Sequence, residues 1–306
     1  MEEFEDAVFT SFPYKIGFTK DLINHPNNYF IASLHCLINI KELSIPILAS
    51  KDEEHPYCQL LTEIGKDKND VEKNEDLINQ FENYIFHEKE YNKKYNEPRN
   101  LIEFILRDLK DSNLINDFPY IYCQKKCKDC GTASTEKLMP IIELDFPKII
   151  EGLNNKKVNK ITINDCYNEF LNSLNNKKIF SCEECNNRNI EVTINKLPPF
   201  IIIFIYYRGE NAHYDYSYEF DEIINLNNSE FYLSSLIACQ NNGNYYETFY
   251  TYARGDKDSS YVFYNGNDVR ENFNVKNKIK KAKIDLRDKK QGWPFVLVYS
   301  TTRGDN

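Results

Sequence analysis

The sequence contains no long hydrophobic run. Among its 306 residues, the longest apolar run extends from Phe200 to Tyr207. A membrane-spanning helix needs about 20 apolar residues, so this run instead predicts a buried β-strand. The first six residues, Met1 to Asp6, are acidic where a secretory signal would be basic and then apolar. We therefore expect an intracellular protein without a membrane segment, located in the cytoplasm or the nucleus.

The sequence also lacks an excess of basic residues. Its 38 Lys and Arg against 47 Asp and Glu give a net charge of −9. Proteins that bind nucleic acid through its phosphates need a positive surface. Direct nucleic-acid binding, including that of a zinc-ribbon protein, is therefore not expected, whereas a basic protein partner is compatible with the charge.

Cysteine is well represented, and four of the nine cysteines form two Cys-x-x-Cys pairs. The pairs are Cys127 with Cys130 and Cys182 with Cys185. Two such pairs can close a tetrahedral, structural Zn²⁺ site, because each presents both sulfurs on one side of a tight turn. Without a secretory signal, the cysteines favour a reducing compartment and metal ligation over disulfides. The sequence thus predicts a zinc site.

Residues next to these pairs support the prediction and also leave one alternative. Gly131 follows the first pair, and Asn186 and Asn187 follow the second, which suits turns of this kind. Two disulfides or four ordinary buried thiols remain possible interpretations. Cys123 is a further candidate ligand, because it lies four residues before Cys127.

The order of predicted elements indicates an α+β protein. Apolar residues recur at helical spacing in the first third, at Phe30, Leu34, Leu37 and Ile38 and again between residues 64 and 112, with breaks expected at Pro46 and Pro98. The middle contains short β-type runs and one probable helix over residues 163–174. The last third predicts strands at residues 200–207, 231–238, 248–254, 261–264 and 295–299. Helices followed by strands are typical of the α+β class.

Several local strings, taken in order, resemble those of the catalytic domain of ubiquitin-specific proteases. The resemblance covers nearly the whole chain and rests on Pro26 to Leu37 (the cysteine box), Cys127 to Gly131 and Cys182 to Cys185 (the zinc knuckles), Leu197 to Ile203, Thr248 to Tyr252, Tyr261 to Val269, and Phe295 to Tyr299. It implies a papain-like hand in a single domain, residues 1–306. Its parts would be a helical thumb (1–115), zinc-bearing β fingers (116–195) and an antiparallel β palm (196–306).

The residues expected at the catalytic positions do not suit a cysteine protease. Such an enzyme needs a thiol at a helix N-terminus, a histidine beside it, and a carboxylate or amide that orients the histidine. Aligned with the family, these positions fall on Asn28, Thr248 and Asn265, and no histidine follows His213. Only the third position, where the family accepts asparagine, holds a suitable residue. The resemblance therefore implies a pseudo-protease.

A pseudo-protease that keeps its zinc ligands is expected to act as a protein-interaction module. Its partners would be the subunits of a protein assembly, or ubiquitin or a ubiquitin-like protein. Short strings, such as the Pro-Asn-Asn-Tyr run ending at Tyr29 and the Trp293-Pro294 pair, also resemble the inactive ubiquitin-hydrolase-like domain in the catalytic subunit of a poly(A)-shortening nuclease. That resemblance would place the chain, as a fragment or trimmed relative, in an mRNA deadenylation complex.

The alternative is an active cysteine deubiquitinase with a displaced nucleophile. Cys36 or Cys58 would then attack the substrate, with His25, His35 or His55 as the base. This alternative is disfavoured, because activation needs a positioned base and not merely a nearby one.

Overall fold

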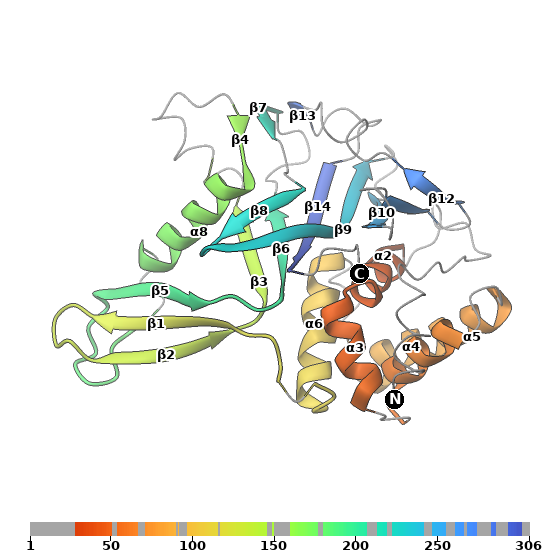
Figure 1. Ribbon diagram of the computed structural model, residues 1–306, viewed down its shortest axis with the longest axis horizontal. Coiled ribbons are helices and arrows are strands. Elements are labelled where there is room, and N and C mark those ends of the chain that lie inside the picture. Colours follow the sequence, from red (N-terminus) through yellow and green to blue (C-terminus); the bar gives the residue numbers. More distant parts are fainter. Residues whose placement is uncertain are drawn as a thin grey trace.

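The structure of the chain is a computed structural model. It describes residues 28–50, 54–66, 71–89, 91, 97–115, 117–145, 149, 160–176, 180–206, 213–218, 222–241, 247–254, 261–265, 268–273, 283–285 and 293–301. His25, one of the candidate bases, lies outside these ranges. Helices gather at one end of the molecule, a three-stranded sheet projects at the other, and a larger sheet lies between them (Figure 1). The expected α+β class is confirmed.

The helical part corresponds to the expected thumb. It contains α2 (Asn28–Ile38), α3 (Lys41–Ser50), α4 (Pro56–Lys66), α5 (Val71–Asn83), the π-helix η2 (Tyr84–Glu88) and α6 (Pro98–Asp111). The predicted apolar stripes face the core: Phe81 in α5 and Ile102 and Leu109 in α6 are almost fully buried. Pro98 begins α6, where its missing N–H has no helical acceptor to lose.

The expected break at Pro46 is wrong, because Pro46 lies inside α3. The helix around it is held by burial: Leu43 and Ile47 are fully buried on either side of the proline. Tertiary packing therefore outweighs the local cost of a proline in a helix, which is about 3 kcal/mol.

The middle of the chain forms the expected fingers. Strands β1 (Ile121–Cys127), β2 (Ala133–Leu138) and β5 (Ile190–Lys196) pair antiparallel in the order β2-β1-β5. Helix α8 (Ile163–Asn176) contacts β5 and extends the part predicted as helical by two residues.

The palm is an eight-stranded sheet. Seven strands follow the order β12-β11-β10-β9-β14-β6-β3, and β8 pairs with β9 beside them. Their bounds are β3 (Ile141–Asp145), β6 (Phe200–Tyr206), β8 (Ile223–Leu226), β9 (Ser229–Asn241), β10 (Glu247–Arg254), β11 (Tyr261–Asn265), β12 (Asp268–Phe273) and β14 (Trp293–Ser300). A small third sheet joins β4 (Lys160–Ile161), β7 (His213–Tyr218) and β13 (Lys283–Asp285).

One palm pairing differs from the all-antiparallel expectation. Strands β3 and β6 run parallel, with Ile142 opposite Ile203. Parallel neighbours need a long crossover connection, and the chain between β3 and β6 supplies one, because it contains both α8 and β5. The fingers are thus partly built from a crossover of the palm.

Helix α2 is the junction of thumb and palm. Every residue from Tyr29 to Ile40 is buried, and α2 contacts α6, β9 and β10. The Ser33 hydroxyl donates to the Pro98 carbonyl at 3.3 Å, and the Cys36 sulfur lies 3.3 Å from the Ser235 hydroxyl of β9. A helix that is apolar on all sides must be enclosed in this way.

A second link joins thumb and palm at the surface. The Arg99 guanidinium of α6 lies 3.6 Å from the centre of the Tyr206 ring at the end of β6, and it pairs with Glu97 at 2.9 Å. The Tyr206 hydroxyl donates to Glu143 of β3 at 3.2 Å.

No single helix of the described chain is long and apolar enough to cross a membrane. One pair, Tyr29–Ile38 with Lys41–Ser50, passes that test together, by length and composition only, and is bent by 78°.

A buried polar network lies among α4, η2 and α6. The Tyr84 hydroxyl donates to Asp108 at 2.9 Å and lies 3.2 Å from His55 Nε2, while Lys89 pairs with Asp108 at 2.8 Å. His55 Nδ1 accepts the Tyr57 backbone N–H, so the ring proton belongs on Nε2. Burial alone would raise the pKa of Asp108, but hydrogen bonds from His55, Lys89 and Tyr84 outweigh it and lower the pKa.

Replacing Tyr84 by Phe should destabilise the protein by about 1–3 kcal/mol, because Asp108 and His55 lose a buried partner. Chemical denaturation measures the effect. Since the folded pKa of Asp108 lies below its ordinary value of 3.8, its contribution is present above that value and is lost as the pH falls through the folded pKa. The Tyr84→Phe variant should show a shallower loss of stability with acid. Tyr120→Phe, at a partly exposed tyrosine, is the control, and an equal loss there would contradict the account.

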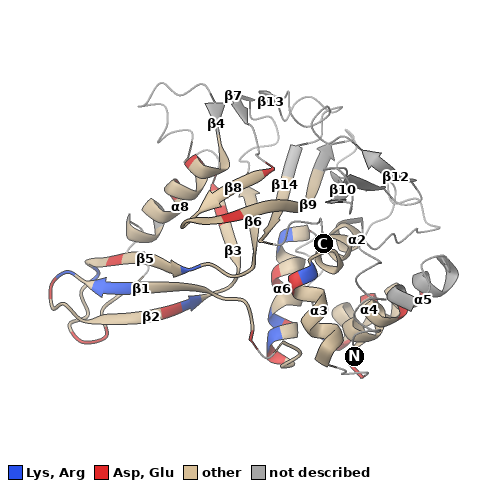
Figure 2. Ribbon diagram, in the orientation of Figure 1, with Lys and Arg blue, Asp and Glu red and all other residues tan. Residues whose placement is uncertain are grey.

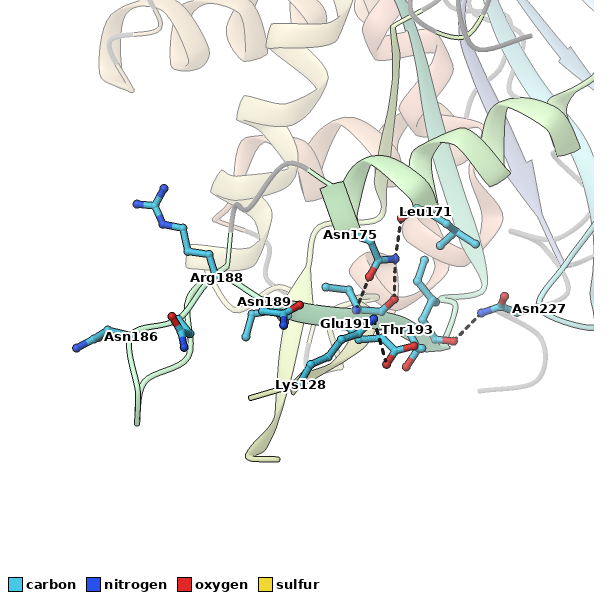
Figure 3. Close-up of a pocket in the computed structure, with 13 residues that line it drawn as sticks. Lys128, Leu171, Asn175, Asn186, Arg188, Asn189, Glu191, Thr193 and Asn227 are labelled. Carbon is cyan, nitrogen blue, oxygen red and sulfur yellow. Dashed lines mark hydrogen bonds and ion pairs between the residues drawn. The ribbon is translucent and has the colours of Figure 1, made fainter. Parts of the chain in front are cut away.

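The joint between α8 and β5 depends on one asparagine. The Asn175 side chain accepts the Val192 backbone N–H at 2.7 Å and donates to the Val192 carbonyl at 3.3 Å, so it mimics a neighbouring strand at the edge of β5 (Figure 3). Asn227 donates to the Ile194 carbonyl at 2.8 Å on the same edge.

The Asn175→Ala variant should lose about 1–2 kcal/mol of unfolding free energy, because both Val192 groups lose a partner. Hydrogen exchange should also accelerate at the Val192 amide. Asn172→Ala, on the same helix, is the matched control, since Asn172 bonds only to exposed Glu169 at 3.4 Å. If both variants exchanged alike at Val192, the role given to Asn175 would be refuted.

Candidate metal centre and protease-like positions

The four predicted cysteines come together at the tip of the fingers. Cys127 ends β1, Cys130 lies in the following turn, and Cys182 and Cys185 lie in the turn that precedes β5. Pairing of β1 with β5 places these turns side by side, with Cys127 opposite Ile190. The metal-binding cluster predicted from the spacing is thus assembled from segments more than 50 residues apart.

The turns have the geometry that the flanking residues predict. Gly131 and Asn186 adopt positive φ angles of 79° and 55°, which glycine and asparagine tolerate best. Each turn is closed by a backbone hydrogen bond from the residue after the second cysteine. The Gly131 N–H donates to the Cys127 carbonyl at 3.0 Å, and the Asn186 N–H to the Cys182 carbonyl at 2.9 Å.

The sulfur positions fit a tetrahedral metal. Cys127 and Cys185 sulfurs are 3.6 Å apart, Cys130 and Cys182 sulfurs are 3.4 Å apart, and all four lie within 4.8 Å of one another. A zinc ion with bonds of ~2.3 Å to four sulfurs would hold them ~3.8 Å apart. A disulfide requires ~2.05 Å, and all four cysteines are free thiols. The disulfide interpretation is therefore wrong for these residues.

The surroundings of the four sulfurs shift the pKa values of two of the thiols in opposite directions. The hydrogen bond with the Thr132 hydroxyl, 3.2 Å away, lowers the pKa of Cys130 to about 6. At Cys185 a backbone hydrogen bond with Asn187 lowers the pKa, but desolvation and the three neighbouring thiols raise it to about 12. The thiolate form is thus favoured at Cys130 and disfavoured at Cys185, and a bound cation would stabilise the thiolate of Cys185. A metal here would be structural, because four cysteines leave no open position for a substrate.

Cys123 is not part of this cluster. It is fully buried on β1, where burial, with a smaller effect of Glu136, raises the pKa of its thiol to about 11. It lies outside the group of four sulfurs that are within 4.8 Å of one another.

The positions aligned with a protease triad lie on α2 and two palm strands. Asn28 is the first residue of α2, Thr248 is the second residue of β10 and pairs with Gln240 of β9, and Asn265 ends β11 opposite Asp268. Helix α2 contacts β10. The elements that would carry a nucleophile and a base are thus neighbours, while the side chains of these three residues lie outside the described part.

The alternative nucleophiles are deeply buried. Burial raises the pKa of Cys36 to about 12, which the hydrogen bond with Ser235 only partly opposes. Its neighbour His35 is also buried, which lowers the pKa of the imidazole to about 3. Cys58 is buried and donates weakly to the Ile47 carbonyl at 3.7 Å, while the ring of His55 is engaged by Tyr57, Tyr84 and Asp108. None of these groups has the environment of an activated thiolate.

An open groove of about 1150 Å³ lies beside the metal-binding turns and the edge of β5. It is lined mainly by asparagines and by Lys128, Arg188 and Glu191 (Figure 3). Its lining offers neither a thiol nor a histidine, so the groove is not a thiol-protease site.

Recombinant wild-type protein should contain one zinc ion per chain, measured by inductively coupled plasma mass spectrometry. Cys185→Ala should remove most of it and lower the melting temperature, because a structural zinc site contributes directly to folding. Cys123→Ala is the matched control, since it removes a cysteine that lies on the fingers sheet but outside the cluster. Its zinc content should stay near one ion per chain. Full zinc content in Cys185→Ala, or its loss in Cys123→Ala, would contradict the assignment.

Comparison with known proteins finds similarity at the level of structure. No protein-family model and no curated protein matches the sequence. Among solved structures, an essential yeast splicing factor matches with a TM-score of 0.61 and 13% identity, over 94% of this chain and 69% of that one. A chain of the Ubp8–Sgf11–Sgf73–Sus1 SAGA DUB module matches with a TM-score of 0.58 and 11% identity, over 94% and 68%.

A second structure of the SAGA module, with a Ubp8 variant and a shortened Sgf11, gives the same result. Its TM-score is 0.56 with 12% identity, over 99% of this chain and 76% of that one. At such low identity the similarity establishes the fold and not the activity. The helical thumb, the fingers with their four-cysteine cluster and the β palm are therefore those of the ubiquitin-specific protease fold.

Proposed function

We propose that this chain is a catalytically inactive ubiquitin-specific-protease-like domain that acts as a protein-interaction scaffold. The observation that carries the proposal is that α2 begins at Asn28. The N-terminus of this helix is where the aligned family places its nucleophile, and a carboxamide cannot form an acyl-enzyme. Thr248, at the aligned base position, lies on the adjacent strand β10. Asn265 suits only the third position, whose residue orients the histidine in the family.

The burial of the remaining thiols supports this proposal against a displaced nucleophile. A thiol whose pKa is raised to about 12, as that of Cys36 is, has a negligible thiolate fraction near neutral pH. A reacting carbonyl would also have to enter the core between α2 and β9 to reach it.

The rest of the fold is what an interaction domain needs. The cysteine cluster and the palm are both present, and their structural role does not depend on a catalytic residue. The matched solved structures include a splicing factor and a DUB module of four named proteins. By analogy we place this chain among the subunits of a protein assembly, with residues 1–306 as one unit and Zn²⁺ as its structural ion.

A more specific assignment rests on the short strings shared with the inactive domain of a poly(A)-shortening nuclease. We propose an mRNA deadenylation complex as the first assembly to examine, in the cytoplasm or the nucleus. The chain would serve there as a fragment or trimmed relative of that subunit. Ubiquitin or a ubiquitin-like protein is the competing ligand, and direct binding of nucleic acid or a membrane is not part of the proposal.

Wild-type protein should not hydrolyse a fluorogenic ubiquitin C-terminal amide faster than buffer, and a ubiquitin electrophile should label none of its cysteines. The reason is that Asn28 offers no thiol at the aligned nucleophile position, and that Cys36 and Cys58 are buried. The Cys36→Ala and Cys58→Ala variants are the controls. Hydrolysis that either variant abolished would refute the inactive assignment.

Calorimetric titration with mono-ubiquitin at low salt then separates the two ligand classes. The scaffold role predicts no measurable heat, and co-purifying assembly subunits should be found instead. Micromolar binding would make the domain a ubiquitin reader. In that case the Asn28→Cys/Thr248→His variant becomes informative, because regained cleavage would show that the cleft still orients the ubiquitin tail.

A further inference from the structure

One face of the fingers sheet carries a row of lysine and tyrosine side chains. Successive residues of a strand point to opposite faces. On β1, Ile121, Cys123 and Cys127 face one way and are buried, whereas Tyr122 faces the other way. The register places Tyr122 between Lys137 of β2 and Lys196 of β5. We call these three residues, with Tyr120 beside them, the Lys–Tyr row.

The row is held together by contacts between ammonium groups and rings. The Lys137 Nζ lies 5.6 Å from the centre of the Tyr120 ring and 5.7 Å from that of Tyr122. The Lys196 Nζ lies 5.9 Å from the Tyr122 ring. The two rings meet edge to face, 6.4 Å apart. Such contacts orient the lysines, and both lysine side chains are exposed.

Lys137 and Lys196 contact aromatic rings, whereas two other lysines of the fingers lie near carboxylates. On the same sheet Lys125 pairs with Glu136 at 2.7 Å, and Lys128 approaches Glu191 at 4.0 Å. Within the described ranges, no carboxylate forms an ion pair with Lys137 or Lys196. In Figure 2 the ends of β2 and β5 nearest the palm carry the blue of basic residues. In a chain of net charge −9, this is a local positive site.

The distance between Lys137 and Lys196 determines how far apart two acidic groups must lie to pair with both lysines. They stand on the outer strands of a three-stranded sheet, and two inter-strand spacings amount to about 10 Å. In a polyproline II segment, residues three positions apart lie on the same face and are separated by about 9 Å, since the helix has three residues per turn and each residue advances ~3.1 Å.

We propose that the Lys–Tyr row docks an acidic segment of a partner protein. Two carboxylates three residues apart in a polyproline II segment pair with Lys137 and Lys196, and the chain between them passes over Tyr122. This inference deepens the proposed scaffold function by naming the chemistry of its partner.

The geometry favours carboxylates over nucleic acid. Proteins that bind single strands offer bare aromatic faces on which bases stack. Here the ammonium groups of Lys137 and Lys196 already lie over the rings. The row also contains no arginine, the residue best suited to bidentate phosphate recognition.

Fluorescence anisotropy on the full zinc-loaded chain tests the proposal. The probe is a fluorescein-labelled peptide with glutamate at every third position and Gly or Ser between, and its control carries glutamine instead. The glutamate peptide should bind at low salt, weaken on raising the salt because exposed charges are screened, and bind at least fivefold more tightly than the glutamine peptide. These two readouts need no variant.

The Lys137→Gln/Lys196→Gln variant should weaken binding of the glutamate peptide about fivefold or more, in line with two exposed ion pairs. Lys110→Gln/Lys126→Gln is the matched control. It removes the same charge at two exposed lysines outside the row and should change the affinity less than twofold. Thermal unfolding verifies that both variants fold.

Four results would each overturn the proposal: no binding of the glutamate peptide, equal binding of the glutamine peptide, equal weakening by the two double variants, or tighter binding of an oligo-uridine strand. None of them bears on hydrolysis or labelling of ubiquitin. Conversely, ubiquitin cleavage would refute the inactive assignment and leave the peptide result unchanged, so the two failures can be told apart.

Discussion

The enclosure of helix α2 is the constraint on which the rest of the structure depends. Its residues from Tyr29 to Ile38 are buried on every side, with α6 on one flank and the palm strands β9 and β10 on another. Removing so much apolar surface from water stabilises the junction of thumb and palm. Helix α2, whose first residue is Asn28, is therefore held against β10 by this packing.

The same enclosure explains why Cys36 does not have the environment of an activated thiol. Cys36 and His35 are adjacent in α2, yet burial raises the pKa of the thiol to about 12 and lowers that of the imidazole to about 3. In the core both groups are driven to their neutral forms. Both residues therefore act as packing groups, and Cys36 joins α2 to Ser235 of β9.

The fingers depend on a different kind of interaction, in which side chains form hydrogen bonds with backbone groups at the exposed edge of the sheet. Asn175 and Asn227 occupy the outer edge of β5, which protects an edge strand that would otherwise pair with other chains. The four cysteines close the tip. In the Lys–Tyr row on the open face, the ammonium groups of Lys137 and Lys196 contact rings. This row is the surface proposed to dock a partner segment.

Features that depend on near neighbours could be predicted from the sequence. The Cys-x-x-Cys spacing with Gly131 and Asn186 fixed the two metal-binding turns, and the apolar periodicities around Phe81 and Ile102 fixed the thumb helices, because turns and helices are set by residues a few positions apart. The order of elements was enough for the α+β class. Other features of the fold follow from the tertiary structure. It kept α3 helical through Pro46, made β3 parallel to β6, and assembled the network of His55, Tyr84, Lys89 and Asp108 from three helical segments. It also set Lys137 and Lys196 on either side of Tyr122. These features depend on strand register and on burial, which join residues tens of positions apart, and no local pattern encodes such distances.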